Sequence, residues 1–172
     1  MCIRDREWVK DEYDLDKYTS EEIAEEINLA STLLFEMDGN NKRTFAYPCS
    51  HYFAGGKSYV GFVSSQFSSA RGSSEEQKEL IKISDIDIHN VPSWAPNNHG
   101  ADELISYIKK IIELETFSTL TFHGIGAEHM TISEEAHEKM LQFLDLNRDK
   151  IWVGTFEENT EYLISKRAKE GK

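Results

Sequence analysis

The heptapeptide LTFHGIG, Leu120–Gly126, decides the fold class, because it places a short apolar run between two helical patterns. Residues 101–115 and 131–146, on either side of it, carry apolar side chains at helical spacing. The run itself favours a β-strand, and it ends in His123, which a glycine-containing loop follows. A strand between two amphipathic helices predicts an α/β protein.

The same alternation of strand and helix extends in both directions along the chain. Strict alternation predicts parallel strands joined by helical crossovers, as in a doubly wound sheet or a β/α barrel. A full barrel needs about 250 residues and eight units. This chain is shorter, so a barrel would be partial and would lack its first strands. The predicted strands are 44–48, 83–91, 117–123 and 150–156, and the predicted helices are 18–37, 59–72, 101–115, 131–146 and 155–169.

Three of the predicted helices begin with the capping-box pattern, a threonine followed three residues later by a glutamate. The three threonines are Thr19, Thr131 and Thr155. The first helix also repeats apolar residues at helical spacing, and we expect that face to be buried. Those apolar residues are Ile23, Ile27, Ala30 and Leu34.

The composition excludes some classes of function. The chain has 172 residues, a length typical of one domain, and 39% hydrophobic residues, enough for a core. Its formal charge of −12 argues against a nucleic-acid surface and against adsorption to anionic lipid. No apolar run approaches the roughly 20 residues of a membrane span.

His123 is the residue at a predicted strand end with the clearest chemical potential. A histidine in that place can donate or accept a proton near neutral pH, and the glycines beside it allow close approach of a ligand. The alternative is a half-buried histidine bonded to a backbone carbonyl. The pattern by itself leaves both interpretations open.

Two further residues have competing interpretations. Trp94, in VPSWAP, is either a platform on which a sugar stacks or a loop anchor in the core. Arg71 either binds a carboxylate or complements the C-terminus of the helix predicted to end near Gly72. The histidines form neither H-x3-H nor H-E-x-x-H, so the sequence offers no metal-ligand set.

Three stretches together resemble a known family. RTFAYPCS, LTFHGIG and KIWVGTFEENTEYL occur in the order and spacing of the polysaccharide deacetylases, the family with the NodB-homology domain, also called carbohydrate esterase family four. The segment LDKYTSEEIAEEI is similar as well, and the likeness extends over residues 14–166. The resemblance implies a deformed (β/α)7 barrel.

The resemblance also implies a chemistry. Family members remove N- or O-acetyl groups from acetylated poly- or oligosaccharides. A divalent metal, usually zinc, is held by an aspartate and two histidines. A second aspartate acts as the base, and a histidine late in the chain acts as the acid. Many members are exported, which implies a secreted or periplasmic protein.

Residue by residue, the likeness assigns His123 the place of the late acid. Tyr47 and Pro48 fall on the wall of the active site, and the family's arginine of that wall falls on Ala46. Arg71 is our candidate replacement for that arginine. Trp94 corresponds to a tryptophan that lines the acyl pocket.

The front of the chain departs from the family pattern. The paired aspartates and the H-[ST]-x-x-H motif are expected before LDKYTSEEI, but MCIRDREWVKDEYD occupies that place and no histidine precedes His51. We therefore interpret residues 1–13 as a truncated or non-native leader and 14–168 as the C-terminal part of a deacetylase domain. The zinc ligands would be absent from this chain, and we expect it to have little or no activity alone.

Two other hypotheses remain. One is a metal-free, carbohydrate-binding relative that uses the same cleft, in which Trp94 and Tyr47 would matter and His123 would not. The other is an unrelated α/β module whose partner is a protein.

Overall fold

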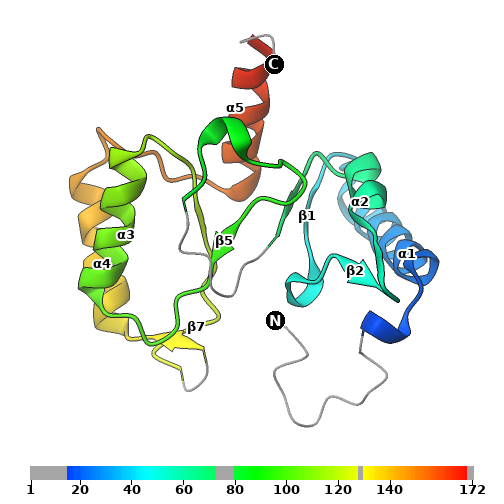
Figure 1. Ribbon diagram of the computed structural model, residues 1–172, viewed down its shortest axis with the longest axis horizontal. Coiled ribbons are helices and arrows are strands. Elements are labelled where there is room, and N and C mark those ends of the chain that lie inside the picture. The colour runs from blue at the N-terminus through cyan, green and yellow to red at the C-terminus, as the bar shows by residue number, and fades with distance from the viewer. Residues whose placement is uncertain (1–14, 73–79, 128–129, 170–172) are drawn as a thin grey trace. The chain divides into compact units, whose positions relative to one another are not determined.

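The computed structural model describes residues 15–72, 80–127 and 130–169 (Figure 1). The predicted leader, residues 1–13, lies outside these ranges. The chain divides into two compact units. Unit 1 comprises the chain up to Ser73 together with Asp87–Val91, and unit 2 comprises Ser74–Ile86 and the chain from Pro92 onward.

Unit 1 is built around a strand–helix–strand motif. Strand β1 pairs in parallel with β4, in the register Phe45 to Ala70, and helix α2 lies between the two strands in the chain. Strands β2 and β3 form a separate antiparallel hairpin. The elements are a 3₁₀ helix Leu15–Lys17, α1 Ser20–Asp38, β1 Thr44–Ala46, a 3₁₀ helix Pro48–Ser50, β2 Phe53–Ala54, β3 Lys57–Ser58, α2 Val60–Gln66 and β4 Ser69–Arg71.

Helix α1 begins as predicted. The hydroxyl of Thr19 accepts a hydrogen bond from the Glu22 amide at 3.1 Å, and the Glu22 carboxylate accepts one from the Thr19 amide at 2.8 Å. The predicted burial of its apolar face holds only for the first turns. Ile23 is buried, whereas Ala30 and Leu34 are exposed, so that part of the prediction is wrong.

The helix predicted for 59–72 is shorter than expected. The backbone becomes extended at Phe67, and Ser69–Arg71 then form strand β4 against β1. The aromatic ring of Phe67 packs on Phe45 of β1 with a centroid separation of 4.9 Å. Tertiary pairing with a strand distant in sequence therefore outweighs the local helical pattern.

Unit 2 repeats the strand–helix–strand motif with a longer helix. Strand β5 pairs in parallel with β6, in the register Trp94 to Leu120, and α3 lies between them in the chain. Strands β7 and β8 form a second parallel pair. The elements are a 3₁₀ helix Ile83–Asp85, β5 Ser93–Trp94, α3 Ala101–Glu113, β6 Thr119–Leu120, β7 Gly124–Ile125, β8 Thr131–Ile132, α4 Glu134–Leu146 and α5 Phe156–Lys169.

Two predicted strands are wrong. Residues 83–91 begin with a 3₁₀ helix and then turn, because the Asp87 side chain and carbonyl accept hydrogen bonds from the amides of His89 and Asn90. Of that segment, Val91 alone forms a β-bridge, with Arg71. Residues 150–156 form no strand either, and Thr155 there starts α5 with the predicted capping box.

The start of α4 also differs from the prediction. Thr131 belongs to strand β8, and Ser133 caps the helix by accepting a hydrogen bond from the Ala136 amide at 3.1 Å. The backbone amide of Ala127 donates to the hydroxyl of Thr131, which is thus engaged in the β7–β8 turn. Ser133, two residues later, caps the helix in its place.

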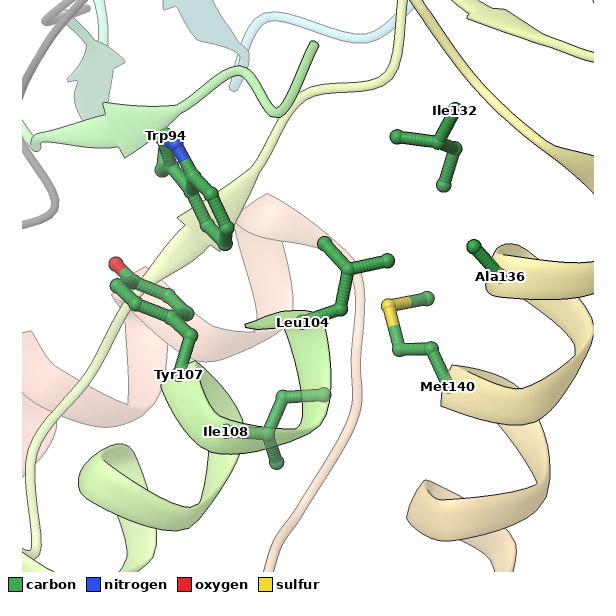
Figure 2. Packing of buried hydrophobic residues seen from close by; sticks show 7 residues of the cluster. All are labelled: Trp94, Leu104, Tyr107, Ile108, Ile132, Ala136 and Met140. Carbon is green, nitrogen blue, oxygen red and sulfur yellow. The ribbon is translucent and has the colours of Figure 1, made fainter. Parts of the chain in front are cut away.

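The core of unit 2 forms between α3 and α4, which lie side by side (Figure 1). Figure 2 shows Leu104 of α3 directed toward Met140 and Ala136 of α4, and Trp94 beside Tyr107. Their burial removes apolar surface from water at about 25 cal/mol per Å². The buried members are Trp94, Leu104, Tyr107, Ile108, Ile132, Ala136 and Met140.

Each strand–helix–strand unit has a parallel strand pair, but one strand of each pair, β4 in unit 1 and β5 in unit 2, lies outside the predicted strands. Within the described ranges the strands form four separate pairs, and these do not close into a barrel. The partial (β/α)7-type barrel stays a prediction. A search of the described helices finds none that is both long enough and apolar enough to cross a membrane.

Candidate functional site

Four of the five candidate residues lie at the carboxyl end of a strand of a parallel pair or within two residues of it, whereas His123 lies three residues beyond β6 and directly before β7. Tyr47 and Pro48 follow β1, and Arg71 is the last residue of β4. Trp94 is the last residue of β5, and His123 follows β6. Three of them belong to unit 1 and two to unit 2, so the structure describes two groups.

Tyr47 is enclosed in unit 1. Its side chain is 2% exposed, and its hydroxyl donates to the His89 carbonyl at 2.9 Å. Burial raises the pKa of Tyr47 to about 12, and the nearby charge of Asp87 adds to that rise. Tyr47 is therefore part of the packed interior of unit 1. The neighbouring Pro48 is exposed and is the first residue of a 3₁₀ helix.

Arg71 is a strand residue, which corrects its interpretation as the end of a helix. It pairs with Ala46, and its carbonyl accepts a hydrogen bond from the Tyr47 amide at 3.2 Å. The side chain is half-buried, and this burial lowers the pKa of the guanidinium. Arg71 thus occupies the strand beside the position where the family's arginine is expected, Ala46.

Trp94 packs in the core of unit 2 and is 3% exposed. Its ring meets that of Tyr107 at 4.5 Å and that of His99 at 5.0 Å, measured between centroids. The cavity that it lines measures about 10 Å³, about the space of one water molecule. This packing is that of a loop anchor, the alternative to a sugar platform.

His123 is exposed, between β6 and β7. Because Leu120 pairs with Trp94, the histidine follows a strand whose carboxyl end adjoins the end of β5. An exposed imidazole can exchange a proton with a bound molecule. The exposure differs from the half-buried histidine that was the alternative interpretation.

His99 is a residue that the sequence reasoning left out. Its ring packs edge-on against Trp94, and its Nδ1 accepts a hydrogen bond from the Asn97 amide at 3.0 Å. It is half-buried and belongs to the loop that follows β5. The available signal was its position: it lies in the turn-rich loop after a strand, as His123 does.

The described residues do not provide a metal centre. A search of them finds no group of three or more His, Cys, Asp or Glu side chains arranged to hold an ion. The family's zinc, which needs one aspartate and two histidines, therefore does not fit the part of the chain that the structure describes.

Comparisons with known proteins add no family assignment. No protein-family model, curated protein or solved structure matches this chain.

Proposed function

We propose that this chain is part of a carbohydrate deacetylase similar to the polysaccharide deacetylases, with His123 as the acid that protonates the leaving group. The observation that carries the proposal is the exposure of His123 in the loop beyond the carboxyl end of β6, a strand of a parallel pair. In α/β proteins the carboxyl ends of strands and the loops beyond them form the ligand site. The likeness of RTFAYPCS, LTFHGIG and KIWVGTFEENTEYL to the family supplies the reaction class.

The role of His123 follows from the chemistry of deacetylation. Attack of water on the acetyl carbon gives a tetrahedral intermediate, which must break its bond to the sugar nitrogen or oxygen. The leaving amine or alcohol needs a proton, and a protonated imidazole can supply it in the same step. His123 is exposed at a strand end and has glycine on its C-terminal side, so a polymer can approach it.

The proposal assigns no step to a metal on the described residues, because they hold no matching ligand set. In the family, the metal lowers the pKa of water and polarises the acyl oxygen. We therefore expect these 172 residues to release little or no acetate on their own, even with added zinc.

The first experiment is the DNA sequence upstream of the Met1 codon in the source genome. A reading frame that continues and encodes the paired aspartates and H-[ST]-x-x-H would support the deacetylase. The extended protein should then release acetate from acetylated chito- or xylo-oligosaccharides. His123→Ala should lower kcat by about 10²–10⁴, the usual contribution of a general acid.

A matched control is His51→Gln, which changes a histidine of unit 1 and should leave kcat unaltered. Unchanged turnover in His123→Ala would remove the assignment of the acid. Turnover by the 172-residue chain alone would contradict the expected inactivity. A stop codon and a start site directly upstream of Met1 would count against the metal mechanism.

The second candidate is a metal-free carbohydrate-binding relative. Titration calorimetry with chito- and xylo-oligosaccharides tests it. Binding that persists in a chelator and in His123→Ala would support the binding protein, and absence of binding would contradict it.

A further inference from the structure

Unit 1 contains a groove of about 270 Å³ beside the second half of helix α1, which the proposed function does not use. Helix α1, the loop that follows it and the end of helix α2 line the groove, whereas Tyr47, Pro48 and Arg71 do not. Its volume is close to the lower limit of small-molecule sites, about 300 Å³. The groove therefore fits a small molecule or one unit of a polymer.

The groove begins where the inward face of α1 changes from apolar to polar. Ile23 is buried and Ile27 is half-buried, and both pack in the core of unit 1. Residues four apart lie on the same face of a helix, so the next residue on that face is Ser31, which lines the groove. A serine leaves open the space that a third isoleucine would fill. The groove thus follows from the sequence of the helix.

Three side-chain amides line the groove, those of Asn28, Asn41 and Gln66. All three residues are exposed, and within the described ranges none of these amides forms a hydrogen bond with another residue. A side-chain amide both donates and accepts hydrogen bonds. The groove therefore offers several groups that match the hydroxyl groups of a ligand, which also donate and accept.

Two phenylalanine rings give the groove an apolar part. Phe35 is 40% exposed and lies on α1 about two turns after Asn28, on the same face. Phe67 is half-buried, and its ring packs on that of Phe45 with a centroid separation of 4.9 Å. An exposed ring beside unpaired amides suits a ligand that has an apolar face and a polar edge.

The groove has no unpaired charge. Arg43 is the one charged residue among the described residues that line it, and its guanidinium forms an ion pair with Asp38 at 2.5 Å. A charged ligand would lose hydration in the groove without gaining an opposite charge, which costs more than the transfer of a neutral molecule. The ligand that fits is therefore neutral.

A sugar ring combines these properties, because one face consists of C–H groups and its edge carries hydroxyl groups. We propose that this groove binds a neutral sugar residue of an oligosaccharide, with its C–H face on Phe35 and its hydroxyl groups on the amides of Asn28 and Gln66. The proposal does not rest on the deacetylase activity, because the groove belongs to unit 1 and His123 to unit 2.

The test is a titration of the ¹⁵N-labelled full chain with xylotriose and with triacetylchitotriose, followed in ¹⁵N–¹H NMR spectra. The side-chain NH₂ groups of Asn28, Asn41 and Gln66 give signals of their own, and we expect saturable shifts of all three. The NH₂ group of Gln142, on α4 and outside the groove, should not shift. Sorbitol, which has hydroxyl groups but no ring, should cause no saturable shift.

Matched variants separate the groove from other surface. Phe35→Ala should weaken sugar binding about 5-fold. Phe53→Ala, at a residue of the same unit that is 45% exposed and outside the groove, should leave it unchanged. Gln66→Ala removes an exposed amide and should also weaken binding about 5-fold, the usual effect of one lost hydrogen bond. Gln142→Ala is its control.

Four results would overturn the proposal. The first is the absence of saturable shifts of the three groove amides with either sugar, and the second is equal affinity of Phe35→Ala and Phe53→Ala. The third is a shift centred on the indole N–H of Trp94, which would place the sugar at the strand ends of unit 2. The fourth is tighter binding of adenosine than of the sugars at the same amides, which would contradict the ligand class.

Discussion

Units 1 and 2 share a strand–helix–strand motif and differ in how its interior is filled. In unit 1 the rings of Phe67, Phe45, Tyr47 and Tyr59 are, in that order, 4.9–5.5 Å apart in successive pairs, and Tyr59 is 2% exposed. Unit 2 has a mixed core, in which aliphatic side chains of α3 and α4 pack with Trp94 and Tyr107, and a cavity of about 510 Å³ beside it. In unit 2 an apolar cleft that α4, α5 and residues 151–154 also line therefore lies beside the motif.

The difference follows from side-chain size and from hydrogen bonding. Tyrosine rings span a wide gap, and their hydroxyls find partners at its far side: Tyr47 donates to the His89 carbonyl and Tyr59 to the His51 carbonyl at 2.5 Å. The aromatic side chains thus fill the interior of unit 1, whereas unit 2 has a cleft that reaches the surface at Trp152, Val153 and Tyr162.

Truncation of the aromatic core should have the largest effect on stability. Tyr59→Ala removes a ring that is 2% exposed, and we expect a loss of about 3–5 kcal/mol in the free energy of unfolding. Urea denaturation followed by far-ultraviolet circular dichroism measures it. Phe53→Ala, at a residue of the same unit that is 45% exposed, should cost much less, and equal losses would show that the rings of unit 1 are not a filled core.

Enlargement of side chains should affect the two units in opposite ways. Ala70 in unit 1 is fully buried, so Ala70→Leu should overpack the core and cost about 1–3 kcal/mol. Leu144→Phe in unit 2 extends into the cavity and should cost nothing. The same urea denaturation compares them, and an equal loss in both variants would mean that the cavity does not persist in solution.

Alkaline pH should weaken the protein through its buried tyrosines. The pKa of an unfolded tyrosine is about 10, and burial raises that of Tyr47 to about 12. The unfolded chain therefore loses its proton first. The contribution of Tyr47 to the free energy of unfolding should be constant below about pH 10 and fall as the pH rises toward 12.

Tyr47→Phe should reduce that slope and cost about 1–2 kcal/mol at neutral pH, since the His89 carbonyl loses its donor. Thermal unfolding at pH 7, 9, 10, 11 and 12 measures both effects. The remaining slope belongs to Tyr59 and Tyr107, whose pKa values burial also raises. Tyr162→Phe, at a residue 52% exposed, is the control, and an unchanged slope in Tyr47→Phe would contradict the burial.

The sequence predicts the helices of this protein better than its strands. Thr19 and Thr155 start helices where their capping boxes indicate, because a cap depends on residues three apart. Strand β4 was hidden in a helical pattern, because its formation depends on pairing with β1, 25 residues earlier in the register Thr44 to Ser69. Distant partners of this kind leave no local signal.

In the candidate site, too, local features could be predicted from the sequence, whereas features that depend on distant residues could not. The position of His123 after a strand could be predicted from LTFHGIG alone. The burial of Trp94 and Tyr47 could not, because it depends on rings contributed by Tyr107 and Tyr59 from other segments. The cavity of unit 2 could not be predicted from local sequence patterns either, because segments far apart in the chain line it together.

The smallest expected difference between the units is at their matched capping boxes. In unit 1 the Thr19 amide donates to Glu22 at 2.8 Å, and in unit 2 the Thr155 amide donates to Glu158 at the same distance. The reciprocal bonds to the threonine hydroxyls measure 3.1 and 3.2 Å. Thr19→Ala and Thr155→Ala should therefore each cost about 1 kcal/mol, with nearly equal values in urea denaturation. Both caps are local and solvent-exposed. Equal losses in the free energy of unfolding would therefore show that the two units differ in their interiors and not in their helix starts. A cost confined to one cap would show instead that the helix starts also differ.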